Sequence, residues 1–205
     1  VYRFRLFSRE RAWPEPLHVQ PETAGLLYRA VTRQVAPDAA RTVADKRRFA
    51  EWCAANGLPT PPMLMEFEAG RVSRSHVPDG AAPPYDLFAK LATAYGGDAT
   101  RLWCHADGAY VDEAGGRWDF AGIVRSLAEQ SRRGPVVLQP RLVNHPALRP
   151  LSPHALSTIR VMTLRAPDGA PRLMTGVLRM ATGAATVGSS PGGSIAMPTT
   201  SEVLA

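Results

Sequence analysis

The sequence predicts an α+β fold, because its expected helices stand apart while its expected strands are joined in pairs by tight turns. The chain has 205 residues, of which 45% are hydrophobic and 20% charged, a composition that can bury a core. It contains no run of about 18 apolar residues, so no membrane-spanning helix is predicted. Its 2 cysteines are too few for a disulfide framework and favour a reducing, cytoplasmic compartment.

Helices are expected where apolar side chains recur at helical spacing. Three segments meet this condition: 21–35, 44–56 and 118–132. Pro37-Asp38 is expected to end the first helix. Asn56-Gly57 offers the left-handed residue that stops the second, and Pro59 forbids its continuation.

Strands are expected in short apolar or alternating segments bounded by turn residues. These segments are 62–67, 86–91, 102–103, 110–111, 136–138, 158–164 and 172–180. Asp107-Gly108 and Pro167-Asp168-Gly169 are turn sequences that would each join two neighbouring strands. Residues 69–84 indicate a polar loop, and residues 181–198, rich in Gly, Ser, Thr and Ala, indicate a loop built for close approach.

The basic charge does not favour a nucleic-acid partner. The net charge is +6, with 24 Lys and Arg residues against 18 Asp and Glu. A phosphate-backbone binder usually gathers such residues on one face among aromatic side chains. Here they are scattered, with short pairs at Arg47-Arg48 and Arg132-Arg133 on expected helix surfaces. A compositional bias toward arginine with solvated side chains explains this pattern, and a basic RNA- or polysaccharide-binding α+β domain stays open as an alternative.

Lys90 is the first candidate for a binding residue. It lies near the end of an apolar strand, and a turn containing Gly96-Gly97 follows within a few residues. An ammonium beside free backbone N–H groups suits a polyphosphate. The alternative on these residues alone is a hairpin turn with a lysine extending to water at its edge.

A wider set of segments resembles one known family. In order along the chain they are Asp45-Lys46, residues 56–61, residues 86–90 with the glycine turn, residues 138–146, residues 157–163 and residues 177–180. Together they resemble the ATP-grasp superfamily, and the later segments look like its sugar-transfer associated branch, a relative of the carboxylate–amine ligases that add glutamate to acceptors. The resemblance covers residues 40–200.

The resemblance implies a role for each matching residue. Lys46 and Lys90 would neutralise the phosphates of ATP, and Gly96-Gly97 would close over them. Gln139, in a hinge formed by Leu138 to Arg141, would make a polar contact near the adenine. Arg160 and Arg179 would face the transferring γ-phosphate or an acyl phosphate, a task that suits the planar guanidinium.

The resemblance also implies an architecture and a reaction. The nucleotide would lie between two α+β lobes: residues 1–43 would precede them, residues 44–137 would form the first, and residues 138–205 would form the hinge and an incomplete second. The protein would be an ATP-dependent ligase using ATP and Mg²⁺ on a small-molecule or glycan-linked acceptor, in surface polysaccharide or natural-product biosynthesis. The ends of the sequence, which starts without Met and stops within an expected ordered region, predict a fragment truncated at both ends. No metal ligand can be named, because the ligands are expected beyond residue 205.

One segment departs from the family pattern. The family reads Val-Asp-Asn, three variable residues and Gly-Gly, whereas this chain has Gly188, Ser189 and Ser194 at the acidic, amide and second glycine positions. Ser189 can still donate a hydrogen bond to a phosphate. A degenerate module that binds nucleotide without turning it over is therefore the alternative to an active ligase.

Other reactive side chains have simpler interpretations. Cys104 and His105 are neighbours in an expected strand and should face opposite ways, so no thiol–imidazole pair is predicted. His145 and His154 do not have a recognised metal-ligand spacing and are expected to fix a loop. For Arg160, the alternative to phosphate binding is a cross-strand ion pair with Asp119 or Glu113.

Overall fold

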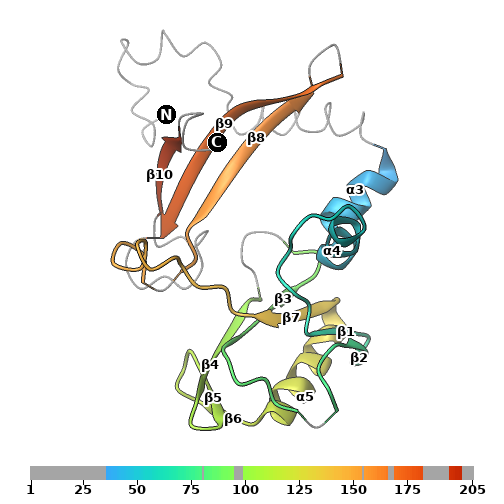
Figure 1. The fold of residues 1–205 in the computed structure, drawn as a ribbon. Coiled ribbons are helices and arrows are strands. Elements are labelled where there is room, and N and C mark those ends of the chain that lie inside the picture. The colour runs from blue at the N-terminus through green and yellow to red at the C-terminus, as the bar shows by residue number, and fades with distance from the viewer. Residues whose placement is uncertain are drawn as a thin grey trace, which may run out of the picture. The chain divides into compact units, whose positions relative to one another are not determined.

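The computed structural model describes residues 36–79, 81–94, 99–153, 155–165, 169–181 and 194–199 (Figure 1). The chain divides between Trp52 and Cys53 into two units. The described residues form helices and two antiparallel sheets, which confirms the α+β class. No helix in these ranges has both the length and the apolar character needed to cross a membrane. The expected helix 21–35 lies outside the described residues.

Two short helices open the described chain, α3 (Pro37–Ala44) and α4 (Lys46–Ala55). The sequence does not predict α3, since Pro37 was expected to act only as a break. Instead Pro37 begins the helix, where its missing N–H removes no intrahelical hydrogen bond. The expected second helix is confirmed as α4, and Gly57 follows it with a φ of +67°.

A seven-stranded antiparallel sheet follows, with the strand order β2-β1-β7-β3-β4-β5-β6. Its strands are β1 (Met65–Glu68), β2 (Arg71–Ser75), β3 (Leu87–Leu91), β4 (Arg101–Ala106), β5 (Ala109–Asp112), β6 (Arg117–Trp118) and β7 (Val136–Pro140). Strand β2 corrects the expectation of a loop over residues 69–84. All five of its residues are exposed, so an edge strand of this kind lacks the apolar alternation by which strands are recognised.

Helix α5 (Phe120–Gln130) packs on one face of this sheet and is continued by a short 3₁₀ helix, η2 (Ser131–Arg133). Asp119 caps its N-terminus by accepting a hydrogen bond from the Gly122 N–H at 2.7 Å. Ile123 and Leu127 are fully buried there and belong to one apolar core with side chains of the sheet. The other members of that core are Leu64, Met65, Phe67, Leu87, Ala89, Trp103, Tyr110, Val136 and Leu138.

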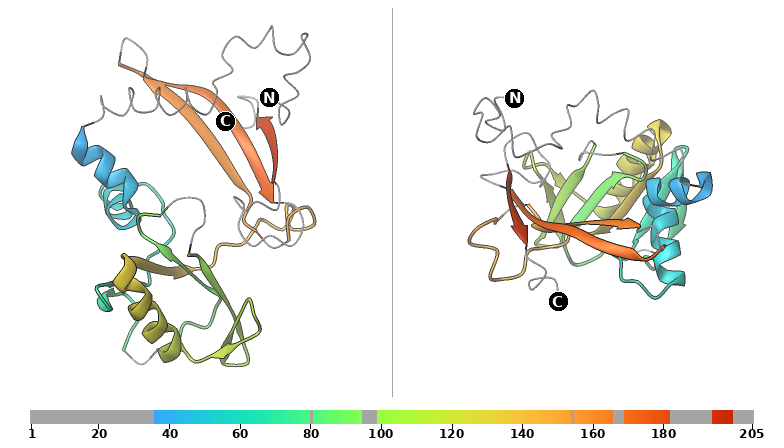
Figure 2. Two further views of the ribbon diagram at one scale, coloured as in Figure 1. Left: turned by 180° about the vertical axis from the view of Figure 1, so that it is seen from behind. Right: turned by 90° about the horizontal axis from the view of Figure 1, so that it is seen from above.

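A second antiparallel sheet has the order β10-β9-β8 and contains β8 (Thr158–Arg165), β9 (Pro171–Ala181) and β10 (Ser194–Thr199) (Figure 2). The expected strand pair is confirmed as β8 and β9. Strand β10 corrects the expectation that residues 181–198 form only a loop, although residues 182–193 lie outside the described part. Pro198 argues against a strand in the sequence, because proline donates no ladder hydrogen bond. Among the described strands β10 pairs only with β9, so it is an edge strand, where proline is tolerated.

Candidate functional site

The candidate site lies on the face of the seven-stranded sheet opposite to the core. Side chains alternate along a strand, and directly paired residues share a face. Lys90 of β3 pairs with Val137 of β7, and Phe88 pairs with Gln139. Since Ala89 and Leu138 belong to the core, Lys90 and Gln139 project from the other face on adjacent strands. Two residues 49 positions apart in sequence are thus brought together by the ladder.

Lys90 is half-buried on this face. Its ammonium Nζ lies 6.0 Å from the centre of the Phe88 ring, at the outer limit of a cation–π contact. The central position of β3, between β7 and β4, fixes the backbone from which Lys90 projects. The Lys90 ammonium therefore projects from a central strand whose backbone is held by a neighbouring strand on each side.

Gln139 is buried, with 4% of its surface exposed. Its Nε2 donates a hydrogen bond to the Pro61 carbonyl at 3.3 Å, which ties the segment before β1 to strand β7. The expected polar contact of Gln139 with a ligand would therefore use its amide oxygen or require that the Pro61 bond be exchanged.

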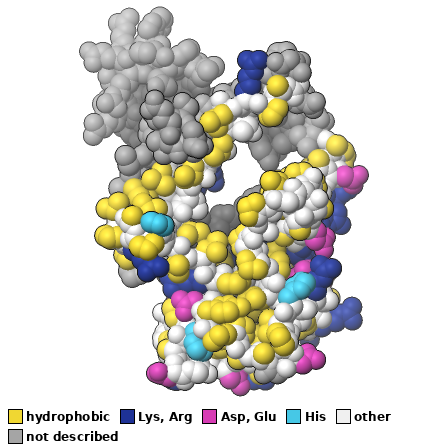
Figure 3. Space-filling view, in the orientation of Figure 1, with side chains coloured by type: hydrophobic (Ala, Val, Ile, Leu, Met, Phe, Trp, Pro, Cys, Tyr) yellow, Lys and Arg dark blue, Asp and Glu magenta, His cyan; other side chains and the backbone are white. Residues whose placement is uncertain are grey.

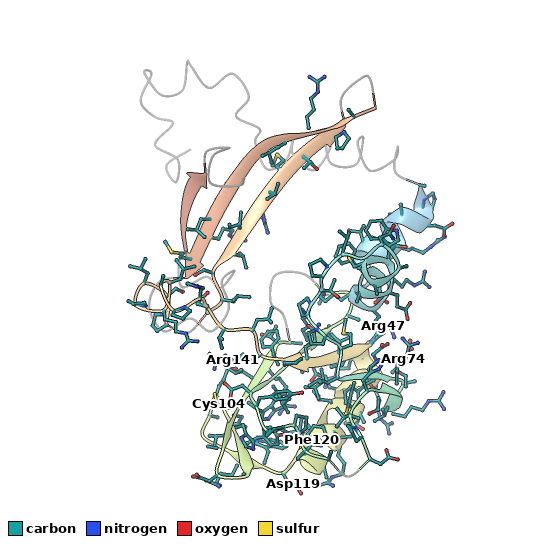
Figure 4. All side chains as sticks on the ribbon, in the orientation of Figure 1. Arg47, Arg74, Cys104, Asp119, Phe120 and Arg141 are labelled. Atoms are coloured by element: carbon teal, nitrogen blue, oxygen red, sulfur yellow. The ribbon has the colours of Figure 1, made fainter. Side chains whose placement is uncertain are left out.

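A charged cluster lies at the carboxyl end of β7, where Figure 4 labels Arg141 and Cys104. Arg141 Nη1 lies 3.1 Å from Asp86 Oδ2 and 3.6 Å from Cys104 Sγ. The second carboxylate oxygen of Asp86 accepts the His105 N–H at 2.9 Å. Burial, followed by the negative charge of Asp86, raises the pKa of the Cys104 thiol, so this thiol is held in its protonated form.

Cys104 and His105 do not form a reactive pair. The His105 ring packs edge-on against Tyr110, a core residue, at 5.3 Å between ring centres. Cys104 lies on the opposite face of β4 with Arg141. The expectation that these neighbours face opposite ways is confirmed.

Lys46 begins α4 and is half-buried. Burial lowers the pKa of its ammonium, and the adjacent charge of Asp45 opposes that change. Arg47 pairs with Asp45 at 2.8 Å. Although burial alone would raise the pKa of Asp45, its hydrogen bonds with Arg47 and the charge of that residue hold it below the usual value. Lys46 and Lys90 belong to different units of the chain, so each is described by itself.

Arg160 and Arg179 lie on one face of the three-stranded sheet. Arg160 of β8 pairs with Val177 of β9, and Thr158 pairs with Arg179. This register makes the two arginines diagonal neighbours. The sequence placed them on adjacent strands and gave neither the register nor the shared face. Arg160 is exposed and Arg179 is half-buried.

The alternative interpretation of Arg160 as half of an ion pair is not supported. Asp119 caps α5, and within the described residues no ion pair joins Arg160 to Asp119 or to Glu113. Three other candidates, Gly96, Gly97 and Ser189, lie outside the described residues, as does His154.

The sequence missed the residue that organises the loop between β7 and β8. Asn144 is buried, and its Nδ2 donates to the carbonyls of Ser152 and Ala155, both at 2.7 Å. Its Oδ1 accepts the Ser157 N–H at 2.6 Å. His145, expected to fix this loop, is exposed, and its Nδ1 accepts only a longer bond from the Ala147 N–H at 3.3 Å. In the sequence, the only sign of this role was the position of Asn144 directly before His145-Pro146 in an expected loop.

Metal binding has no candidate among the described residues, where no three His, Cys, Asp or Glu side chains lie close enough together to hold an ion. Comparison of the chain with protein-family models, with curated proteins and with solved structures found no significant match.

Proposed function

We propose that the chain is the nucleotide-binding part of an ATP-dependent ligase of the ATP-grasp type. The observation that carries the proposal is the placement of Lys90 and Gln139 on adjacent central strands, on the sheet face opposite to α5. An ammonium beside a buried amide on a rigid sheet supplies one group for phosphate and one for a polar ring edge. The resemblance of the sequence to ATP-grasp proteins joins these two groups into one nucleotide site.

Phosphate neutralisation is the role we assign to the lysines. Lys90 and the Gly96-Gly97 turn would hold the phosphates, and Gln139 would orient the base. For Lys46 the family resemblance alone implies a phosphate-neutralising role. Arg160 and Arg179 would meet the transferring phosphoryl group, since a diagonal pair of guanidinium groups offers two planar forks to one anion. Mg²⁺ would supply further charge neutralisation at the phosphates, but the described residues show no acidic cluster for it.

The reaction that fits these groups is acyl transfer through an acyl phosphate. A substrate carboxylate oxygen attacks the γ-phosphorus of ATP and ADP leaves. An amine then attacks the acyl carbon, and inorganic phosphate leaves as the amine loses a proton. The chain contributes position and positive charge to both steps and no protein nucleophile.

A second candidate function is nucleotide binding without turnover. The observation that favours it is the sequence Gly188-Ser189 at the positions where the family has Asp-Asn. Loss of the acidic group would remove charge needed for catalysis and leave the phosphate-binding lysines in place.

Thermal unfolding of the whole chain with ADP and Mg²⁺ tests nucleotide binding. Ligand at 100 times its dissociation constant should stabilise the folded chain by about 2.7 kcal/mol. Lys90→Ala should abolish this shift, whereas Arg125→Ala, which removes an exposed basic side chain of α5, should leave it intact. The absence of a shift in the wild type would contradict the proposal.

Two further measurements separate the alternatives. Stabilisation by ADP without phosphate release from ATP, in the presence of carboxylates and amines, would favour the module that does not turn over. A salt-dependent gel shift with RNA, together with no response to ADP, would favour the basic binding domain instead.

A further inference from the structure

A hollow of about 270 Å³ lies in the loop between β7 and β8. Lys90 and Gln139 do not line it. Arg141, which does, ends the expected hinge segment, and its side chain has no role in the nucleotide site proposed above. Two arginines and four apolar residues line the hollow, with Asn144: Arg141, Arg149, Leu142, Val143, Pro153 and Leu156. Its volume falls just below the range of about 300–1,000 Å³ typical of sites for drug-sized ligands, so a smaller organic molecule fits it better.

The lining has an excess of one positive charge. Arg141 is matched by Asp86 at 3.1 Å. Arg149 donates from Nε to the Asn144 carbonyl at 3.1 Å, and within the described ranges no carboxylate lies within ion-pair distance of it. That bond engages Nε alone and leaves the two terminal nitrogens, which can grip both oxygens of one carboxylate. A dianion such as phosphate would gain less, because the nearby Asp86 carboxylate opposes a second negative charge.

The loop is held in one shape before any ligand arrives. Asn144 is 7% exposed and Ser152 1% exposed, and the Asn144 side chain bonds to three backbone groups of residues 152–157. The Ser152 hydroxyl adds a bond to the Ala155 carbonyl at 3.1 Å. Arg149 is tied to the same asparagine through its backbone carbonyl. A ligand would therefore meet a preorganised arginine and would order little of the chain on binding.

The apolar part of the lining is unusually open to solvent. Leu142 is 46% exposed and Val143 58% exposed. Figure 3 shows hydrophobic side chains gathered over this part of the chain, with basic side chains beside them. An apolar body covering these side chains would be stabilised by the area it removes from water.

We propose that this hollow binds a small organic monocarboxylate with an apolar body, its carboxylate on Arg149 and its body over Leu142 and Val143. The site does not depend on nucleotide binding at Lys90. The charge excess selects a single negative charge, and the exposed leucine and valine select an uncharged, apolar remainder.

Nuclear magnetic resonance of the whole chain, labelled with ¹⁵N, tests this with hexanoate as the probe and hexanamide as its neutral match. Hexanoate should shift the Arg149 Nε–H and the loop amides saturably, with a dissociation constant in the millimolar range expected for so few atoms. Hexanamide should leave them unmoved. Arg149→Met should weaken binding on the order of tenfold to hundredfold, the effect of losing a charge-assisted hydrogen-bonded pair. Arg149→Lys should weaken it less.

Several results would overturn the proposal. Equal binding of hexanamide would show that the site does not recognise the carboxylate charge. Equal binding of inorganic phosphate would show that the site selects neither a single charge nor an apolar body. The matched control is Arg125→Met on α5, and an equal loss there would mean nonspecific attraction. Should Arg149→Met disturb the fold, visible as changes throughout the spectrum, the comparison of hexanoate with hexanamide on the wild type decides alone.

Discussion

The strongest prediction concerns Asn144, whose replacement should open the loop between β7 and β8. Asn144→Ala removes two buried bonds at 2.7 Å and one partly buried bond at 2.6 Å. Each is worth about 0.5–1.5 kcal/mol net, so their sum lies near 3 kcal/mol. The Ala155 carbonyl keeps its bond from the Ser152 hydroxyl, which limits the penalty of leaving carbonyls unpaired.

Native-state hydrogen exchange measures this loss within the loop. The Ser152 N–H donates to the Leu148 carbonyl at 3.0 Å and does not touch the Asn144 side chain, so it reports opening of the loop itself. A loss of about 3 kcal/mol should speed its exchange about a hundredfold, because each 1.4 kcal/mol is worth a factor of ten.

His145→Ala is the matched control, one residue away on the same loop. Its side chain is exposed and accepts one bond at 3.3 Å, so exchange of the Ser152 N–H should change by about twofold, as for other surface substitutions. An unchanged exchange rate in Asn144→Ala, or an equal acceleration in both variants, would refute the assignment of Asn144 as the organiser of the loop.

Three further predictions concern turns and caps of the seven-stranded sheet. Asp119→Ala should lower the free energy of unfolding by about 1 kcal/mol in urea denaturation through loss of the helix cap, and Asp119→Asn should retain most of it. Gly70→Ala and Gly108→Ala both place a side chain at positive φ, +83° and +73°, and should each cost about 1 kcal/mol by the same assay. The two losses should be similar, because the atoms nearest to a new Cβ at Gly70 belong to the exposed side chain of Arg132, which can shift, and nothing lies within 4 Å at Gly108. The hydrogen bond from the Trp118 indole lowers the pKa of Asp112 below 3.8. Asp112 therefore stabilises the fold above that pH, and this contribution is lost as the pH falls further. Asp112→Asn should flatten this part of the curve of stability against pH.

The sequence predicted the elements that bury an apolar stripe or end in a turn. Strand β3, helix α5 and the pair β8 and β9 all follow from spacing and turn residues, because burial and periodicity are local properties of the chain. It missed β2, which is stabilised by pairing at an edge and buries nothing. It also missed α3, because proline occurs both just after the end of a helix and at the first position of the next.

The candidate site was predictable as a set of residues and unpredictable as an arrangement. The sequence singled out Lys90 by its position before a glycine turn and Gln139 through a family resemblance, and it gave no reason to place them on one face. That follows from the register of β3 and β7, a long-range pairing that no local pattern encodes. The bond from Gln139 to the Pro61 carbonyl is of the same kind, since its partners lie 78 residues apart.

The arginine excess takes on a physical meaning once these contacts are known. Of the 24 Lys and Arg residues only Lys46 and Lys90 are lysine, which the sequence alone reads as a bias. Arg101 is placed over two indole rings, 4.6 Å from that of Trp103 and 5.3 Å from that of Trp118, and bonds to a serine hydroxyl at 2.6 Å. A planar guanidinium can stack and donate at once, and the compact ammonium of lysine cannot. Bias alone therefore does not explain every arginine, because at least this position uses the shape of the group. Lysine is then informative where it persists, since its flexible point charge can neutralise a phosphate but cannot stack on a ring as a guanidinium does. The substitution that isolates this argument is Lys90→Arg, which keeps the charge and changes only its shape.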